Sequence, residues 1–133
     1  MAYKGYLKKD AIRNYFPMPN AIFNLGLTTG ELAVYTYLMF CENRKTYQCF
    51  PSFRTIGNAV GMSRPTVKKH VDGLVEKCLI YTEPTSIFTK AGKKQNGSLM
   101  YTIRPIKEAQ QHHYEQQLIQ FAREENENRQ KAA

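Results

Sequence analysis

Residues 51–77 read PSFRTIGNAVGMSRPTVKKHVDGLVEK, and this stretch decides the fold. Ser52 and Ser63 each precede a run of apolar residues at helical spacing, and serine is a preferred helix N-cap. Gly61 is a good C-terminal stop for the first run, and Pro65 is tolerated in the first turn of the second. The sequence therefore predicts two short helices joined by a tight turn.

The apolar residues of these two helices form one inward-facing set. Its members are Ile56, Val60, Met62, Val67, Val71 and Leu74. Val67, Val71 and Leu74 stand at i, i+4 and i+7, which is the spacing of one helix face. Gly57 supplies a small residue where the helices cross. We expect the first helix to brace the second one from behind.

A β-hairpin is predicted after the helices. Residues 79–88 are rich in β-forming side chains, residues 90–97 are a polar turn region that ends in Asn96-Gly97, and residues 99–104 form the returning strand. Two short helices followed by a hairpin are the order of a winged helix-turn-helix. The expected fold class is mainly α with a β-hairpin wing, and the expected domain spans residues 28–105.

The rest of the chain flanks this domain. Thr28 and Glu31 form a capping-box pattern before a helix that runs to about residue 43, and residues 44–50 are a connector with a short strand. Residues 106–133 are expected to form a C-terminal helix with a frayed tail. Residues 1–27 are expected to be an arm and a short packed segment whose aromatic side chains lie against the domain: Tyr3, Tyr6, Tyr15, Phe16 and Phe23.

Charge is unevenly distributed along the chain. The 133 residues carry a formal net charge of +8. Residues 1–105 hold fifteen Lys or Arg against six Asp or Glu, whereas residues 106–133 hold four against five. The basic excess therefore belongs to the domain and its arm, and it indicates a polyanionic partner, most commonly nucleic acid.

The N-terminal end of the second helix presents a basic face. With the apolar stripe turned inward, steps of about 100° per residue leave the outward set Arg64, Thr66, Lys68 and Lys69. This end of such a helix contacts base edges, and its dipole favours phosphate. The wing adds Lys90, Lys93 and Lys94.

Two stretches resemble known families. Residues 49–56 (CFPSFRTI) and 61–67 (GMSRPTV) resemble the winged domains of GntR-type repressors and, equally, the winged helices of plasmid and phage replication proteins. Residues 16–23 (FPMPNAIF), leading to Leu27, resemble the start of the N-terminal domain of the replication initiator A family. The resemblance covers roughly residues 16–105 and departs from the GntR pattern at Cys78, where Gly is common, and at Gly57, where Ala is common.

The resemblance also implies DNA contacts at particular positions. It implies that Arg54 contacts DNA, and that Ser63 and Arg64 open the recognition helix. Thr66 and Lys68 match further DNA-facing positions. These residues, together with Lys69 and the three wing lysines, make up the predicted DNA-binding set.

Sequence-specific binding of double-stranded DNA by a transcriptional regulator is the function that these patterns favour. DNA binding during plasmid or phage replication initiation is the alternative, and a protein-docking winged helix is a second one. An enzyme is disfavoured, because no Gly-rich phosphate loop or nucleophile motif appears, although a Tyr nucleophile for DNA nicking stays open. We expect no cofactor and no metal, with His112 and His113 as a weak metal candidate on a polar helix.

Cysteine usage and hydropathy suggest a cytoplasmic protein at the nucleoid or on a mobile element. Cys41, Cys49 and Cys78 have no paired spacing, no signal peptide opens the chain, and no apolar run approaches the roughly 20 residues of a membrane span. The C-terminal helix carries a narrow apolar stripe: Tyr114, Leu118, Phe121 and Ala122. Because an isolated helix of this kind is marginal in water, the stripe is expected to dock on the chain's own first helix or on a second copy, with a homodimer favoured.

Overall fold

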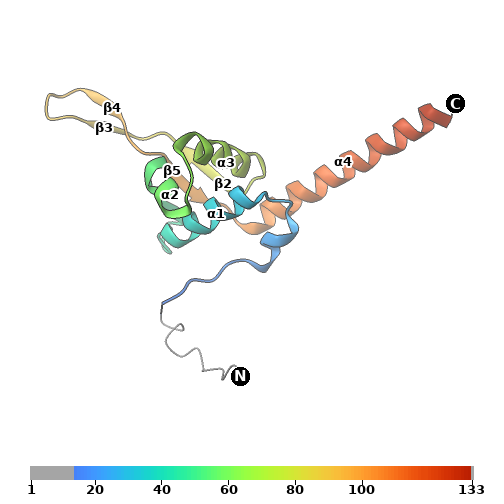
Figure 1. Ribbon diagram of the computed structural model, residues 1–133, viewed down its shortest axis with the longest axis horizontal. Helices are drawn as coiled ribbons and strands as arrows, with labels where there is room; N and C mark the ends of the chain where they lie inside the picture. Colours follow the sequence, from blue (N-terminus) through green and yellow to red (C-terminus); the bar gives the residue numbers. More distant parts are fainter. Residues whose placement is uncertain (1–13, 133) are drawn as a thin grey trace, which may run out of the picture.

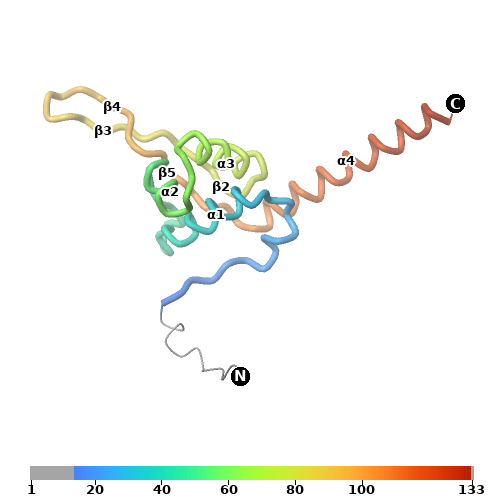
Figure 2. The backbone as a smooth tube through the Cα atoms, viewed as in Figure 1, coloured from blue at the N-terminus to red at the C-terminus, as the bar shows by residue number. Residues whose placement is uncertain are grey.

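The computed structural model describes residues 14–132. Three helices and a small antiparallel sheet form the body, and a β-hairpin and a long helix leave it at opposite ends (Figures 1 and 2). In chain order the elements are η2 (Asn20–Asn24), α1 (Thr29–Cys41), β1 (Gln48–Cys49), α2 (Phe53–Val60), α3 (Arg64–Glu76), β2 (Ile80–Glu83), β3 (Ser86–Phe88), β4 (Lys94–Asn96), β5 (Met100–Ile103) and α4 (Ile106–Ala132). The predicted winged helix-turn-helix fold is confirmed.

The helix boundaries follow the predicted caps. Thr28 and Glu31 form a complete capping box at α1: the Glu31 backbone N donates to Thr28 Oγ1 at 3.2 Å, and the Thr28 backbone N donates to Glu31 Oε1 at 2.8 Å. Ser52 and Ser63 cap α2 and α3. Helix α1 ends at Cys41, slightly earlier than predicted, because the chain turns extended at Glu42.

The core lies where α1, α2 and α3 meet the sheet. The predicted inward residues of α3 are all buried, as is Ile56 of α2, whereas Val60 and Met62 are half-buried at the edge. The largest fully buried side chains are Ile22, Val34, Tyr35, Leu38, Ile56, Val67, Val71, Leu74, Leu79, Ile80 and Tyr101. The helices are thus fixed to one another by a single continuous core.

The sheet has the strand order β1-β5-β2, and both pairings are antiparallel. The predicted short strand in the connector is β1, whose Gln48 pairs with Thr102 and whose Cys49 pairs with Tyr101. The returning strand β5 therefore lies in the centre of the sheet and carries the buried Tyr101. This arrangement anchors the base of the hairpin in the core.

The outer part of the hairpin is a separate two-stranded ribbon of β3 and β4. Glu83 pairs with Met100 at its base, and Ser86 pairs with Asn96 in the ribbon, so the returning strand advances four residues while the outgoing strand advances three. One extra residue in the segment 97–99 is the signature of a β-bulge, which bends and twists a ribbon. The bulge separates the projecting wing from the core sheet.

The segment before α1 packs less completely than predicted. Ile22 and Leu25 enter the core, and Phe16 lies half-buried with its ring centroid 5.8 Å from that of Phe40. Phe23, however, is 77% exposed, and Tyr15 is also exposed, so the prediction that they lie against the domain is wrong. In the short helix η2 the buried position goes to Ile22, which leaves its neighbour facing outward. Tyr3 and Tyr6 lie outside the described residues.

Helix α4 contacts the body only near its start. Ala109 is its one buried residue, and the helix packs on η2 before leaving the body. Leu118 and Phe121 are 50% and 60% exposed, so the stripe does not dock on α1. The expected frayed tail is instead helical up to Ala132, in keeping with the high helix propensity of its Glu, Gln, Arg and Ala residues.

Gly57 lets α2 approach the turn that leads into α3. A Cβ at this position would clash with the carbonyl oxygen of Met62 and would touch Val67 of the recognition helix. The backbone N of Met62 donates to the Gly57 carbonyl at 2.9 Å across the same contact. This close contact explains why the chain has glycine at position 57, where GntR-type domains commonly have alanine.

Gly57→Ala should lower the free energy of unfolding by about 1 kcal/mol net. Overpacking costs about 1–3 kcal/mol, whereas alanine gains at most about 1 kcal/mol in helix propensity. Urea denaturation measures the difference, and Asn58→Ala, at the exposed next residue of α2, is the matched control. A Gly57→Ala variant as stable as the wild type would contradict the close contact.

Candidate nucleic-acid interface

The turn between α2 and α3 sets where the recognition helix begins. Gly61 ends α2 in the left-handed conformation, with φ at 74°, and its backbone N donates to the Gly57 carbonyl. Ser63 then caps α3 by accepting a hydrogen bond from the backbone N of Thr66 at 3.4 Å, and Pro65 lies in the first turn. Only three residues therefore separate the two helices.

Helix α3 buries one face and presents the other to solvent. Val67, Val71 and Leu74 are buried, whereas the four predicted outward residues are exposed: Arg64, Thr66, Lys68 and Lys69. The predicted inward and outward faces of this helix are confirmed. The exposed N-terminal end carries the positive end of the helix dipole, which favours an anion.

A partly buried ion pair holds α3 against α1. The Lys77 ammonium lies 2.6 Å from Glu31 Oε1 and also donates to the Gly26 carbonyl at 3.0 Å. Burial raises the pKa of the Glu31 carboxyl, but the hydrogen bonds from Lys77 and Thr28 outweigh it, so the pKa lies below its usual value. Gly73 leaves room for this carboxylate, because a Cβ there would clash with it. The pair fixes the C-terminal end of the recognition helix.

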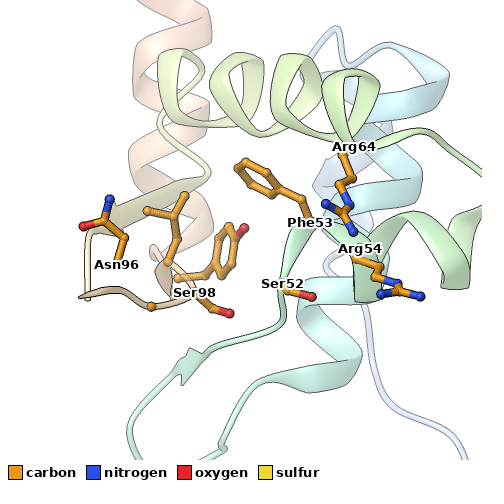
Figure 3. A pocket seen from close by; sticks show the side chains of 9 residues that line it. Ser52, Phe53, Arg54, Arg64, Asn96 and Ser98 are labelled. Atoms are coloured by element: carbon orange, nitrogen blue, oxygen red, sulfur yellow. The ribbon is translucent and has the colours of Figure 1, made fainter. Parts of the chain in front are cut away.

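A hollow of about 440 Å³ lies between the starts of α2 and α3 and the returning strand of the wing. Arg54 from α2 and Arg64 from α3 line it together with Ser52, Phe53 and Asn96 (Figure 3). Within residues 14–132 neither arginine takes part in a salt bridge. Two exposed guanidinium groups therefore share a concave surface that can accept an anion such as a phosphate.

The structure brings some predicted residues together and leaves others apart. Ser63 and Thr66 are joined, since their hydroxyl oxygens lie 2.8 Å from each other. Lys68 forms an exposed ion pair with Asp72, with 2.8 Å between Nζ and Oδ2. The wing lysines are exposed on the projecting hairpin and do not line the hollow: Lys90, Lys93 and Lys94.

Sequence reasoning missed two features of this surface. Phe53 lines the hollow, and Phe88 stands exposed on the wing. Phe53 follows the predicted cap of α2, and Phe88 ends the predicted outgoing strand. The direction of Phe53 depends on the approach of β5 to α2, and that of Phe88 depends on the pairing register of the wing. No local pattern in residues 86–96 indicates which side of the wing Phe88 faces.

The described residues contain no arrangement typical of a metal site. Across residues 14–132 no three side chains of His, Cys, Asp or Glu gather as a metal would require. Burial raises the pKa of the Cys49 thiol to about 12, so this thiol is held in its unreactive protonated form. Over the same residues no helix has both the length and the apolar character to cross a membrane.

The fold and this surface define a winged helix-turn-helix domain, a class of DNA-binding domain. The family model for a helix-turn-helix domain matches residues 25–80, which contain α1, α2 and α3. A solved structure described as a possible transcriptional regulator from Methanosarcina mazei Go1 is similar, with a TM-score of 0.50 and 18% identity, over 77% of this chain and 80% of that chain. At this identity the likeness concerns the fold. No curated protein matches the chain.

Proposed function

We propose that this protein binds specific sequences of duplex DNA and regulates transcription. The observation that carries the proposal is the hollow at the starts of α2 and α3, where Arg54 and Arg64 meet the returning strand of a lysine-rich wing. A major groove about 12 Å wide admits a helix such as α3, and the wing then reaches the flanking backbone. The proposed place of action is the bacterial or archaeal nucleoid, or a mobile element.

The residues of this surface divide into positioning and reading groups. Arg54 and Arg64 contact phosphates, because both line the same hollow and neither forms a salt bridge within residues 14–132. Thr66 and Lys68 read base edges, with Ser63 orienting the Thr66 hydroxyl. Lys69 and the wing lysines add phosphate contacts. Lys68 exchanges its exposed partner Asp72 for the DNA, at little cost because such surface pairs contribute at most about 1 kcal/mol.

Selection of bound DNA from a random pool separates the two biological roles. A palindrome, which mirrors a two-fold protein dimer, supports a transcriptional regulator. Tandem repeats support the alternative role in replication initiation, which the resemblance of residues 16–27 favours. Absence of any enriched duplex would contradict both roles and favour a protein-docking module.

Binding should be strongly salt-dependent. Four to six phosphate contacts give a slope of log affinity against log salt of roughly −4 to −5, and Arg54→Ala with Arg64→Ala should make it shallower by about 2. Fluorescence anisotropy across a salt series measures the slope. The control removes two arginines from α4, with Arg123→Ala and Arg129→Ala, and should leave it unchanged. Equal slopes for the two double variants would refute the assignment.

Lys68→Ala should weaken binding to the selected site by about 1–3 kcal/mol and relax the preference at one base pair. Lys69→Ala, the control on the same helix, should weaken selected and random duplexes alike. Asp72→Asn should strengthen binding to both, because it frees the Lys68 ammonium and removes a negative charge near the DNA. The role of Lys68 as a base reader fails if Lys68→Ala weakens selected and random duplexes by the same factor.

We further propose that α4 makes the protein a homodimer. Ala109 faces the body, and Leu118 follows nine residues later, which places it about 180° away around the helix axis. The stripe therefore faces away from the chain's own domain. Residues 106–133 carry four basic and five acidic side chains, so two such helices can pair without strong repulsion. A second copy would cover the stripe and support a helix that is marginal alone.

Leu118→Glu with Phe121→Glu should convert the dimer to a folded monomer, as measured by sedimentation at tens of micromolar. The matched control, Gln116→Glu with Gln120→Glu, adds the same charge to the same helix and should remain dimeric. A truncation after His113 keeps the buried Ala109 and should also be monomeric. A monomeric wild type, or a truncated dimer, would show that the stripe is not the interface.

A further inference from the structure

Two large apolar side chains stand in solvent on the projecting wing. Phe88 is 75% exposed and Ile87 is 54% exposed, both on β3. The ribbon of β3 and β4 extends away from the body, where no other element of residues 14–132 covers it (Figure 1). Phenylalanine is among the side chains that are enriched where proteins contact their partners.

The pairing register shows which face of the ribbon each of the two side chains occupies. Phe88 pairs with Lys94 and Ile87 pairs with Gln95, so the two apolar side chains point to opposite faces of the ribbon. The Thr89 backbone N donates to the Lys93 carbonyl at 2.8 Å, which makes the Phe88–Lys94 pair a non-hydrogen-bonded one. Side chains are closest at such pairs. Phe88 and the aliphatic part of the Lys94 side chain therefore lie together on one face.

That face is continuous with the hollow between the arginines. Asn96 lies two residues from Lys94 on the same strand, so its side chain is on the Phe88 face, and Asn96 lines the hollow with Arg54 and Arg64. Two residues of a strand span about 7 Å. An extended ligand bound in the hollow that continues along this face reaches Phe88 next.

The charge around Phe88 identifies the chemistry of that ligand. Residues 84–98 contain Lys90, Lys93 and Lys94 and no acidic residue. A partner must therefore supply negative charge and an apolar face at neighbouring positions. Duplex DNA supplies both, as phosphates flanking stacked bases, and the hollow places it at the start of this face.

We propose that Phe88 enters the minor groove beside the sequence contacted by α3 and wedges between two base pairs. This inference rests on the proposed DNA binding and adds a deforming activity to it. The wedge partly unstacks one step and kinks the duplex toward the major groove, where α3 lies, while Lys94 and its neighbours hold the flanking phosphates. Because pyrimidine–purine steps unstack most easily, the protein prefers such a step at a position that no side chain hydrogen-bonds.

The test uses the intact protein and a duplex selected from the random pool. Phe88→Ala should lower affinity about tenfold, the scale of one lost aromatic–base contact, without changing the salt slope. It should also abolish the bend measured by energy transfer between the duplex ends. 2-Aminopurine, scanned through the flank, should brighten at one step with wild type and stay quenched with Phe88→Ala.

Three further variants separate the wedge from general effects. Ile87→Ala removes an exposed apolar side chain from the opposite face and should leave affinity, bend and 2-aminopurine signal unchanged. Lys94→Ala should make the salt slope shallower by about 0.9 while keeping the bend. Phe88→Leu, which keeps an apolar wedge, should retain most of the bend. Thermal melting should be the same for all four variants, since these side chains are exposed.

Several results would overturn the inference. If wild type binds and Phe88→Ala binds and bends the duplex equally well, the proposed function survives and the wedge does not. If Ile87→Ala lowers the affinity and the bend as much as Phe88→Ala does, the effect belongs to the hairpin as a whole. If Phe88 is needed for binding to vesicles of anionic phospholipid but not to DNA, the partner is a membrane surface. If wild type binds no duplex, the proposed function fails as well.

Discussion

The Glu31 carboxylate is the constraint on which the position of the recognition helix depends. Its side chain is almost fully buried, and an unpaired charge in such a place would be strongly destabilising. It is satisfied twice, by its own helix cap at Thr28 and by Lys77 from the end of α3. Gly73 must stay without a side chain to admit it. Gly57 lets α2 pack closely against Met62, in the turn before α3. The contact between Glu31 and Lys77 therefore helps to position both Arg54 and Arg64.

The small core carries two projections that serve different surfaces. The wing is anchored by β5 at the centre of the sheet, next to the start of α2, so it extends the basic side of the domain. Helix α4 leaves from the other end of β5, where Ala109 meets the segment around η2. One strand therefore links the proposed DNA surface to the proposed dimer surface. A dimer formed by α4 would leave both wings and both recognition helices free to reach DNA.

Local signals in the sequence predicted most of the fold, whereas long-range contacts escaped it. Serine caps, Gly61 and the apolar spacing of α3 act within a few residues, so the helix-turn-helix and its outward face could be derived. The partner of Glu31 is 46 residues away and has no local pattern. The exposure of Phe23 depends on which residue of η2 reaches the core, and the faces of the wing depend on a bulge. The hollow beside Arg54 needs three separate elements to meet, so composition alone could not show it.

Each of the two projections carries exposed apolar side chains, and the charge around each group selects its partner. On the wing, Phe88 has three lysines nearby and no acid in residues 84–98, so a second copy of the same hairpin would be repelled and a polyanion attracted. On α4 the stripe lies among acidic and basic residues in nearly equal number, which removes the attraction for DNA and permits pairing with itself. Exposed apolar side chains therefore indicate DNA as the partner on the wing and a second copy of the chain on α4. The charge around them distinguishes the two cases, whereas hydrophobicity does not.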